Sequence, residues 1–415
     1  MKKTHSRRDF LKVAGAVSAA SFVAPQCFIL AEEAKGANEK VALASIGAGG
    51  RGTDLFREFM NCDDARLVAV ADCYQSRRTN LAGACEGKPF LDYHEFLDDP
   101  GIDAVIIATA DHQHVPAAIA AAKAKKSAYV EKPLGLSIAE NLMCEKVFAE
   151  MGVVFQYGTQ QRSQHNCWLG CEAVRQGKIG KVVAIEVDAP NGGTGGDPTE
   201  APIPDDLSEA GFRTWLGTAP RKPYSVDRCK VPGTYWIYDY SIGYLGGWGA
   251  HPLDIMVWGS DADLSGIVTV EGTAKIGAPL YDTVYDWDMN IMLGDVPLTF
   301  RTGGDRTKFI GETGEWITVS RGGTWASRDD LLAGISGENP ILPQSHTNHC
   351  KDFVWGVKNN KTPVSHLRDA VRSDIISHLC DISIRTDSVV KWDPTKQELV
   401  DASDAQKKMI RREYA

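Results

Sequence analysis

A glycine-rich turn near the start of the chain is the feature that most constrains its fold. The apolar run Val41–Ile46 is followed by three glycines in the spacing Gly-x-Gly-x-x-Gly, namely Gly47, Gly49 and Gly52. In such a turn the first glycine permits a tight bend, the second lets the backbone approach a pyrophosphate, and the third lets helix and strand pack closely. Free N–H groups at the start of the following helix attract phosphate charge. The stretch therefore predicts a dinucleotide site that includes Gly50 and Arg51.

An aspartate at the end of the next apolar run strengthens this interpretation. The run Leu67–Ala71 leads into Asp72, twenty residues after Gly52. At that distance an acidic side chain accepts hydrogen bonds from both ribose hydroxyls of NAD. Arg77 and Arg78 follow and have the charge to bind a 2′-phosphate, but Asp72 would repel one. The sequence therefore favours NAD over NADP.

The first part of the chain alternates predicted strands and helices, as a doubly wound sheet requires. Two further apolar runs, Ala104–Thr109 and Ser127–Val130, are expected to be strands buried on both faces. Ligands of such sheets bind outside the carboxyl ends of the strands. We therefore expect four residues at these ends to face the cofactor: Thr109, His114, Glu131 and Lys132. For His114 the alternative is a packing residue at the start of a helix.

Beyond Gly158 the pattern changes. Later strands are expected around 180–188, 266–275, 287–293, 298–302 and 316–320. Helices are expected at 51–60, 91–97, from after His114 to about 125, and at 137–151, 165–176, 345–353 and 367–384. A Gly-, Pro- and Asp-rich stretch, 191–206, is long enough to be a functional loop or a lid. The predicted architecture is an α/β Rossmann domain (38–158) followed by an α+β domain with a large, mostly antiparallel open sheet (159–415).

The first 37 residues differ in kind from the rest. Ser6-Arg7-Arg8-Asp9-Phe10-Leu11-Lys12 precedes a weakly apolar run at 13–24, a pattern that matches the twin-arginine export signal better than a basic surface helix. The run is too short and too rich in alanine and glycine to predict a membrane span. We expect a periplasmic or otherwise extracytoplasmic protein. Because the twin-arginine route carries folded proteins, the cofactor is expected to bind before export and to stay bound.

Composition and cysteine spacing argue against other classes of partner. The 415-residue chain carries a net charge of −9, and no basic bias predicts binding to nucleic acid. Its ten cysteines include no Cys-x-x-Cys pair. Cys167 and Cys171 lie one helical turn apart, which makes neither a zinc site nor an expected disulfide. We expect no essential metal.

Six sequence features occur in the order of one known family: Gly47 to Gly52, Asp72, Ala108-Thr109 with His114, Glu131-Lys132-Pro133, Trp215-Leu216-Gly217 and Gly249-Ala250-His251-Pro252-Leu253-Asp254. The chain resembles the glucose-fructose oxidoreductase, inositol dehydrogenase and rhizopine-catabolism (Gfo/Idh/MocA) family. The resemblance implies NAD(P)-dependent oxidation or reduction of a sugar or polyol hydroxyl. It also implies that the open sheet forms the interface of a homodimer or homotetramer.

The resemblance assigns Lys132 as the active-site lysine and His251 as the catalytic histidine. The family usually has an aspartate four residues before that histidine, and this chain has Gly247 there. Asp254, one turn beyond His251, can still orient the imidazole or contact the cofactor ribose. The alternative for Asp254 is an ordinary aspartate on a helix surface.

Oxidising a secondary alcohol requires a base for the hydroxyl proton. Lysine suits this role when desolvation and a neighbouring positive nicotinamide ring lower its pKa, and histidine is already in the working range. We hypothesise that Lys132 and His251 share the substrate hydroxyl, one binding it and the other taking its proton. Six further side chains are candidates for contacts with sugar hydroxyls and faces: Gln160, Arg162, Tyr235, Trp236, Asp254 and His346.

Two other functions are compatible with the same residues. A redox-neutral enzyme would oxidise a ring hydroxyl, cleave a glycoside or epimerise a centre, and then return the hydride. A non-catalytic dinucleotide- or sugar-binding protein would share the fold without turnover. The leading hypothesis is a periplasmic sugar or polyol oxidoreductase that retains its cofactor.

Overall fold

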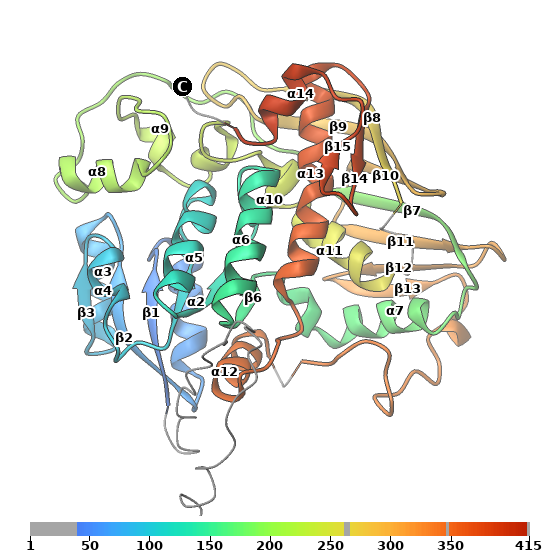
Figure 1. Ribbon diagram of the computed structural model, residues 1–415, viewed down its shortest axis with the longest axis horizontal. Coiled ribbons are helices and arrows are strands. Elements are labelled where there is room, and N and C mark those ends of the chain that lie inside the picture. The colour runs from blue at the N-terminus through green and yellow to red at the C-terminus, as the bar shows by residue number, and fades with distance from the viewer. Residues whose placement is uncertain (1–39, 261–265, 346–347, 413–415) are drawn as a thin grey trace, which may run out of the picture. The chain divides into compact units, whose positions relative to one another are not determined.

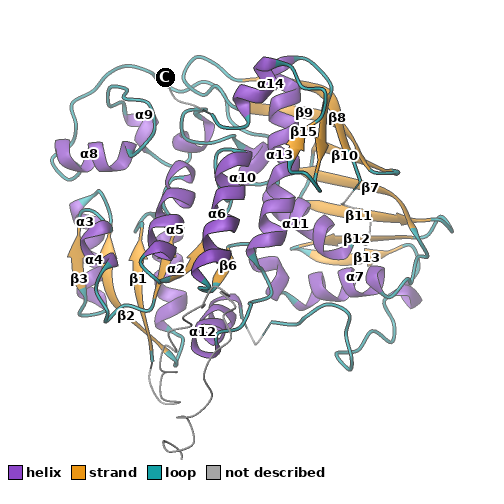
Figure 2. Ribbon diagram, viewed as in Figure 1, coloured by secondary structure: helices purple, strands orange, loops and turns teal. Residues whose placement is uncertain are grey.

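The structure is a computed structural model that describes residues 40–260, 266–345 and 348–412. The predicted twin-arginine signal and spacer, and the candidate substrate residue His346, lie outside the described residues. Two sheets carry the described architecture, one of six strands and one of nine, each with its own helices (Figure 1, Figure 2).

The first sheet is parallel throughout. Its strands are β1 (Val41–Ile46), β2 (Ala65–Ala71), β3 (Lys88–Phe90), β4 (Ala104–Ile107), β5 (Ser127–Val130) and β6 (Phe155–Tyr157), in the order β3-β2-β1-β4-β5-β6. The associated helices are α2 (Gly50–Met60), α3 (Gln75–Ala84), α4 (His94–Leu97), α5 (His114–Lys123) and α6 (Ile138–Met151). Every residue of β1, β4 and β5 is buried, as a central parallel strand requires. The strand order reverses between β1 and β4, so a ligand crevice is expected at their carboxyl ends.

Two expectations for this first domain need correction. The helix expected over 91–97 is shorter in the structure, where α4 begins only at His94. The Asp92 carboxylate accepts the N–H of His94 at 3.0 Å, and this hydrogen bond forms a turn before the helix. Strand β3 was not expected, since its three residues include Pro89. That proline is tolerated because β3 lies at the edge of the sheet and pairs only with β2.

The second sheet is mostly antiparallel. Its strands are β7 (Val182–Ala189), β8 (Val268–Ile276), β9 (Val284–Leu293), β10 (Val296–Thr302), β11 (Arg306–Gly311), β12 (Trp316–Ser320), β13 (Gly323–Ala326), β14 (Val390–Asp393) and β15 (Glu398–Leu399). They run in the order β13-β12-β11-β7-β10-β9-β8-β14-β15, and only β7 and β10 pair in parallel. The predicted fold class, a Rossmann domain followed by a domain with a large, mostly antiparallel sheet, is confirmed. Strands β11, β13, β14 and β15 were not expected.

Helices pack on one face of this second sheet. They are α7 (His165–Arg175), α11 (Ala250–Gly259) and α13 (Leu367–Thr386). Along β9, buried and more exposed side chains alternate, which indicates that the opposite face is open. Helix α13 is buried along most of its length and also contacts α6 of the first domain. The two domains therefore share part of one packed interior.

Helix α12 (His349–Asn359) begins later than the expected helix at 345. The Asn348 side chain accepts the N–H of Lys351 at 2.8 Å and so caps the helix at that point. The helix then continues beyond 353 and packs against α2 and β1 of the first domain.

Between β7 and α11 the chain returns over the first sheet. This part contains α8 (Ser208–Leu216), α9 (Val226–Cys229), the short helix η3 (Gly233–Trp236) and α10 (Tyr244–Gly247). We call residues 203–241 the strap. Figure 1 shows α8 and α9 of the strap beyond the carboxyl ends of β1, β2 and β3. The strap overlaps the end of the stretch 191–206, which the sequence predicts to be a functional loop or a lid.

Candidate active site

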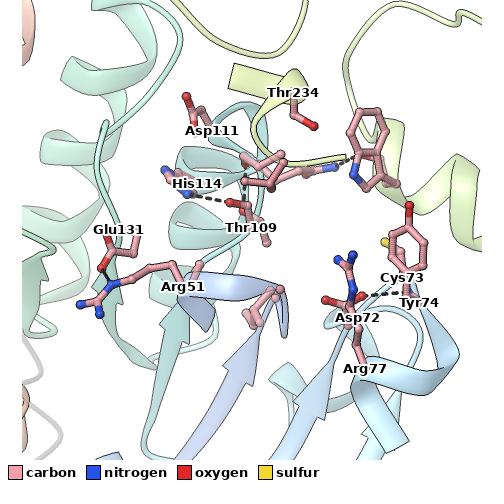
Figure 3. Close-up of a pocket in the computed structure, with 18 of the residues that line it drawn as sticks. Arg51, Asp72, Cys73, Tyr74, Arg77, Thr109, Asp111, His114, Glu131 and Thr234 are labelled. Carbon is pink, nitrogen blue, oxygen red and sulfur yellow. Dashed lines mark hydrogen bonds and ion pairs between the residues drawn. The ribbon is translucent and has the colours of Figure 1, made fainter. Parts of the chain in front are cut away.

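A cleft lies at the carboxyl ends of β1, β2, β4 and β5, where the strand order reverses (Figure 3). The first domain supplies its floor and the strap supplies its other wall. The cleft-lining residues include seven of the predicted cofactor residues from three strand ends: Gly47, Gly49, Gly50, Arg51, Asp72, Thr109 and His114. Glu131 and Lys132 line it from the end of β5, and Trp215 and Tyr235 line it from the strap.

The glycines of the first turn divide into two structural groups. Gly47 has φ +91°, and a Cβ there would lie 2.5 Å from the carbonyl oxygen of Ala108. A Cβ on Gly52 would overlap the carbonyl oxygen of Gly47, so this glycine lets α2 pack closely on β1. Around Gly50 nothing lies within 4 Å of a built Cβ, and around Gly49 only the Arg77 Nη1 at 3.6 Å. The open space beside Gly49 and Gly50, at the start of α2, is what a pyrophosphate would fill.

Asp72 is fixed at the end of β2 by backbone donors. The N–H of Ala48 donates to its Oδ2 at 2.7 Å, and the N–H of Tyr74 donates to its Oδ1 at 2.8 Å (Figure 3). Burial raises the pKa of Asp72, and these two donors oppose that shift. The Arg77 guanidinium lies 4.0 Å from the centroid of the Tyr74 ring. This end of the cleft combines a carboxylate for ribose hydroxyls with an aromatic and cationic wall.

The loop after β4 links the two domains, mainly through backbone groups. His114 Nδ1 lies 2.6 Å from the Pro133 carbonyl oxygen, and its Nε2 lies 3.3 Å from that of Thr109. The ring therefore holds the β4 and β5 loops together, which favours the packing role over direct contact with a cofactor. His112 Nε2 lies 2.9 Å from the Trp215 carbonyl oxygen in the strap. Burial lowers the pKa of His112 to about 4, so that ring is neutral.

Asp111 is a buried acid in this loop that the sequence did not single out. It lines the cleft, is 3% exposed, and accepts the Ser241 Oγ–H at 2.7 Å on Oδ2. Burial raises the pKa of Asp111, opposed by the nearby charge of His114, the Ser241 hydrogen bond and the charge of Lys132. Its contact joins the first domain to the end of the strap. A lone aspartate between an alanine and a histidine has no spacing signal that would have marked it.

The two charged residues after β5 have different partners. Glu131 is buried and accepts Arg51 Nε–H at 2.9 Å, which ties the start of α2 to the end of β5 (Figure 3). Lys132 points across the domain boundary, where its Nζ donates to the carbonyl oxygen of Gly247 at 2.9 Å. The predicted active-site lysine therefore contacts the very residue that replaces the expected aspartate. Around Gly247, a built Cβ would meet only Tyr244, at 3.9 Å.

His251 lies on α11, four residues beyond Gly247, and is 3% exposed. Its Nδ1 lies 2.9 Å from Gln161 Oε1, and Arg321 Nη1 lies 3.4 Å from its Nε2. Burial, then the positive charges of Lys132 and Arg321, lower the pKa of His251 well below its ordinary value. The predicted histidine is thus a neutral imidazole held by two side chains, Gln161 and Arg321, that the sequence did not single out.

Two of the predicted substrate residues form a buried ion pair with each other. Arg162 Nη2 lies 2.6 Å from Asp254 Oδ1, and both side chains are about fully buried. Arg162 Nη1 also pairs with Asp369 Oδ2 at 2.8 Å. Neither Arg162 nor Asp254 lines the cleft. Their contacts indicate a structural role, and Asp254 reaches His251 only through Gln161, whose Nε2 donates to Asp254 Oδ2 at 2.9 Å.

The remaining substrate candidates are placed differently. Tyr235 lines the cleft, whereas Trp236 is buried behind it and packs against Tyr244, with ring centroids 4.3 Å apart. Gln160 begins the short helix η2 (Gln160–Ser163), and its Oε1 is buried without a hydrogen-bond partner. Of this set, only Tyr235 contributes to the cleft wall.

The described residues contain no cluster of metal ligands and no helix that could span a membrane. No group of three or more His, Cys, Asp and Glu side chains is placed to hold a metal ion within residues 40–260, 266–345 and 348–412. None of the described helices combines the length and apolar character needed to span a bilayer. The nine cysteines in this part of the chain are all free thiols.

The strap is fastened to the first domain on both sides of the cleft. At α3, Ser76 donates from its N–H to Asp206 Oδ1 at 2.7 Å and from its Oγ to Oδ2 at 2.6 Å. At the β4 loop, Gln113 Nε2 donates to the Thr214 carbonyl oxygen at 3.1 Å. A Cβ on Gly217, which has φ +53°, would overlap the Gln113 amide, so the Trp215-Leu216-Gly217 sequence permits this approach. A ligand in the cleft would be enclosed on two sides.

The fold and the cleft define a two-domain protein of the dinucleotide-binding Rossmann class. The family model "Oxidoreductase family, NAD-binding Rossmann fold" matches residues 41–159, and "Oxidoreductase family, C-terminal alpha/beta domain" matches residues 194–414. The chain belongs to the Gfo/Idh/MocA oxidoreductase family.

The sequence matches to individual relatives cover only part of the chain, whereas the structural matches cover most of it. The chain is 32% identical over 160 residues to myo-inositol 2-dehydrogenase of Thermotoga maritima, covering 38% of this chain and 46% of that protein. It is 30% identical over 240 residues to a glycosyl hydrolase family 109 protein of Stenotrophomonas maltophilia, covering 54% of this chain and 51% of that protein. The chain thus spans about half the length of the curated relatives it matches.

Two solved structures illustrate the shared fold. Aldose-aldose oxidoreductase of Caulobacter crescentus, complexed with glycerol, superposes with a TM-score of 0.62 at 16% identity, covering 85% of this chain and all of that chain. The WlbA dehydrogenase of Bordetella pertussis, in complex with NADH and UDP-GlcNAcA, also gives a TM-score of 0.62 at 16% identity, over 85% of this chain and 97% of that chain. At these identities the likeness establishes the fold alone.

Proposed function

We propose that this protein is an NAD-dependent oxidoreductase that acts on a secondary hydroxyl of a sugar or polyol. The observation that carries the proposal is the juxtaposition of a dinucleotide cradle with Lys132, whose ammonium group reaches Gly247 beside the His251 helix. Membership of an NAD-binding oxidoreductase family supports it. So does the likeness to a protein named as an inositol dehydrogenase.

NAD is proposed as the cofactor because the residues present fit it. Gly49 and Gly50 leave space at the start of α2 for a pyrophosphate, and Asp72 presents a fixed carboxylate for ribose hydroxyls. A 2′-phosphate would meet the Asp72 charge, although Arg77 stands nearby. Bound NAD supplies the hydride acceptor for the alcohol carbon. The protein side chains then have to bind and orient the alcohol and accept its proton.

Lys132 and His251 divide that work in the proposed mechanism. The Lys132 ammonium is a hydrogen-bond donor that can exchange the Gly247 carbonyl for a substrate oxygen. The uncharged His251 ring offers one lone pair as a proton acceptor. Arg321 donates toward that lone pair when no substrate is bound, so a substrate hydroxyl has to replace this contact. Asp111 and Tyr235 line the cleft and supply further polar groups for neighbouring hydroxyls.

The proposal includes a retained cofactor and an extracytoplasmic location. Retention is supported by the strap, which is bonded to α3 and to the β4 loop on the two sides of the cleft. The location rests on the twin-arginine pattern of the sequence. A homodimer or homotetramer formed through the open face of the second sheet is part of the same proposal. Ladders of oppositely charged side chains on that face, such as Arg301 with Asp288 at 2.6 Å, support a polar interface.

A redox-neutral activity is the second candidate. It is supported by the 240-residue alignment to the glycosyl hydrolase family 109 protein and by a 30% identical match over 192 residues to an α-N-acetylgalactosaminidase of Shewanella oneidensis. In this case, oxidation, bond cleavage or epimerisation, and return of the hydride would occur behind the closed strap.

One experiment tests both candidates. The purified protein is denatured and the released dinucleotide identified; the folded protein is then mixed with inositols, aldoses and aryl glycosides. A rise in the absorbance of reduced nicotinamide supports the oxidoreductase. The rise should be stoichiometric with the enzyme when only retained NAD is present, or continuous when NAD is added. Product formed without net reduction supports the redox-neutral enzyme. A protein that binds the dinucleotide but gives neither result would contradict both.

A further inference from the structure

The tautomer of His251 follows from its neighbour Gln161. The Gln161 Nε2 donates to two acceptors, the His251 carbonyl oxygen at 3.2 Å and Asp254 Oδ2 at 2.9 Å. This orients the amide, so its Oε1 faces the His251 Nδ1 at 2.9 Å. An amide oxygen can only accept, and Nδ1 therefore carries the ring proton. The Nε2 of His251 is left as the lone-pair nitrogen.

Arg321 occupies the position opposite that lone pair. It lies in the turn between β12 and β13, and its Nη1 lies 3.4 Å from His251 Nε2. The guanidinium is fixed by Asp305, whose Oδ2 lies 2.8 Å from Nε and 2.7 Å from Nη2. It also lies over the Trp248 ring, 4.9 Å from the centroid. Three contacts thus aim one N–H of Arg321 at the imidazole.

We propose that Arg321 is a positioning residue of the active site, which together with Gln161 keeps His251 as the neutral Nδ1–H tautomer and holds its Nε2 lone pair until a substrate hydroxyl takes the place of the Arg321 N–H. Asp305 in turn sets the position of Arg321. A carboxylate facing the ring would favour the imidazolium, whereas a guanidinium disfavours it. His251 then remains a proton acceptor into acidic pH.

The charged groups that act on the His251 ring are positive, and all of them lower its pKa. Lys132, Arg321 and Arg51 act on the ring as positive charges, and His349 opposes protonation as well. Asp254 is the nearby acid, but Arg162 neutralises it and Gln161 separates it from the ring. Arg321 is the one of these cations that hydrogen bonds to the imidazole itself. Its removal should therefore change the ionisation of the ring and the choice of tautomer.

The first test needs no substrate, so its failure is separate from a failure of the proposed function. The holoprotein is labelled with ¹⁵N-histidine, and the ring nitrogens are followed by NMR between pH 5 and 8, with His251→Asn used for assignment. Wild-type His251 is expected as the Nδ1–H tautomer without titration in this range. In Arg321→Met the pKa of His251 should rise by roughly one unit or more, because a contacting cation that opposes protonation of the ring is lost.

Two further variants complete the experiment. Arg321→Lys keeps the positive charge and should restore most of the wild-type behaviour. Arg57→Gln, which removes an exposed arginine of α2, is the matched control without effect. Once a substrate is identified, the acid limb of the kcat/KM profile should move to higher pH in Arg321→Met but not in Arg57→Gln. An unchanged His251 titration in Arg321→Met, or an Nε2–H tautomer in the wild type, would overturn the proposal.

Discussion

The two ends of the cleft are built by different means. At the end near Asp72, the binding groups lie close in sequence, and backbone atoms do most of the positioning: Gly47 bends the chain, and the N–H groups of Ala48 and Tyr74 hold the carboxylate. At the other end, Lys132 lines the cleft and bonds to Gly247, one helical turn before His251, which does not line the cleft itself. Around His251, side chains from distant segments meet, namely Gln161 and Arg321. Local backbone conformation thus defines the dinucleotide end, and long-range packing defines the reacting end.

The two ends also differ in the charge of the side chain that each one holds in place. The half-buried Asp72 is stabilised by two backbone N–H donors, one on each carboxylate oxygen. The buried His251 is kept uncharged by burial and by nearby cations. If this comparison is right, substitutions at one end should change one property of the enzyme and leave the other nearly unchanged. The following predictions test that separation.

The largest effect is expected at Lys132. Replacing it with Met should lower kcat roughly 10²- to 10⁴-fold, the usual contribution of a group that handles the transferred proton. That loss corresponds to about 3–5 kcal/mol of transition-state stabilisation. Because Lys132 bonds to Gly247 and not to the glycine turn, the affinity for NAD should stay within about threefold. Steady-state kinetics and calorimetric titration with NAD measure the two properties.

The matched variant for Lys132 is Lys125→Met, which removes an exposed lysine two residues beyond the end of α5 whose Nζ donates to the Met151 carbonyl oxygen. Its kinetics should equal those of the wild type. Turnover in Lys132→Met that stays within tenfold of wild type would remove the lysine from the chemistry, and a large loss of NAD affinity would mean that the two ends of the cleft are not separable.

The same difference between the two ends explains which parts of the site the sequence predicts and which it does not. The β1 turn, Asp72 and the ends of β4 and β5 were predictable because glycine spacing and buried apolar runs are local signals. The strap contacts and the partners of His251 were not predictable from the sequence. Gln161 and Arg321 carry no spacing signal, and they meet the ring only after the second sheet has formed. Arg162 and Asp254 were assigned to the substrate because a charged residue in the chain does not reveal its burial.

The next largest effect is expected at that buried pair. Asp254→Ala leaves Arg162 with Asp369 as its remaining carboxylate, and removing one partner of a buried ion pair is strongly destabilising. We expect a loss of about 3 kcal/mol in the free energy of unfolding, at the low end of the usual range because Asp369 stays paired. Urea denaturation measures it. Asp369→Ala should cost less, since that side chain is partly exposed and Asp254 remains.

A substrate role for Asp254 predicts the reverse pattern. The KM for the sugar would rise steeply while the free energy of unfolding stayed near the wild-type value. Measuring both quantities on Asp254→Ala and Asp369→Ala therefore decides whether this region belongs to the reacting end of the cleft or to its structural support.

A smaller effect is expected from Asp374, which links α13 to the loop of Lys132. Its Oδ2 accepts the Leu134 N–H at 2.6 Å and its Oδ1 accepts the Tyr157 hydroxyl at 2.8 Å. Burial raises the pKa of Asp374 to about 7, opposed by these two donors and reinforced by the charges of Asp254 and Asp111. The folded state then binds a proton that the unfolded chain has released, so stability falls as pH rises.

The expected decrease is about 2 kcal/mol between pH 5 and 7, from about 1.4 kcal/mol per pH unit. Asp374→Asn cannot ionise, while its amide can accept from Leu134 and donate to the Tyr157 oxygen. The difference between wild-type and variant stabilities should therefore shrink with rising pH, as urea titrations at several pH values will show. Parallel pH profiles for the two proteins would mean that Asp374 is already ionised in the folded state at pH 5.

The smallest effect is expected at the strap, and it tests the dinucleotide end. Asp206→Ala removes both Ser76 hydrogen bonds to the carboxylate but leaves the main-chain bond from Gln75 to the Asp206 carbonyl at 2.7 Å. If opening of the strap limits release, NADH should dissociate roughly five- to tenfold faster, as expected for the loss of about one net hydrogen bond. The neighbouring Asp205→Ala removes an exposed carboxylate and is the matched control. Stopped-flow displacement of bound NADH measures the rate constant of dissociation. The rate constant of a single turnover should not change.

Equal release rates for Asp206→Ala, Asp205→Ala and wild type would show that the strap does not hold the dinucleotide. Retention would then have to come from the cradle at Gly49 and Asp72 alone.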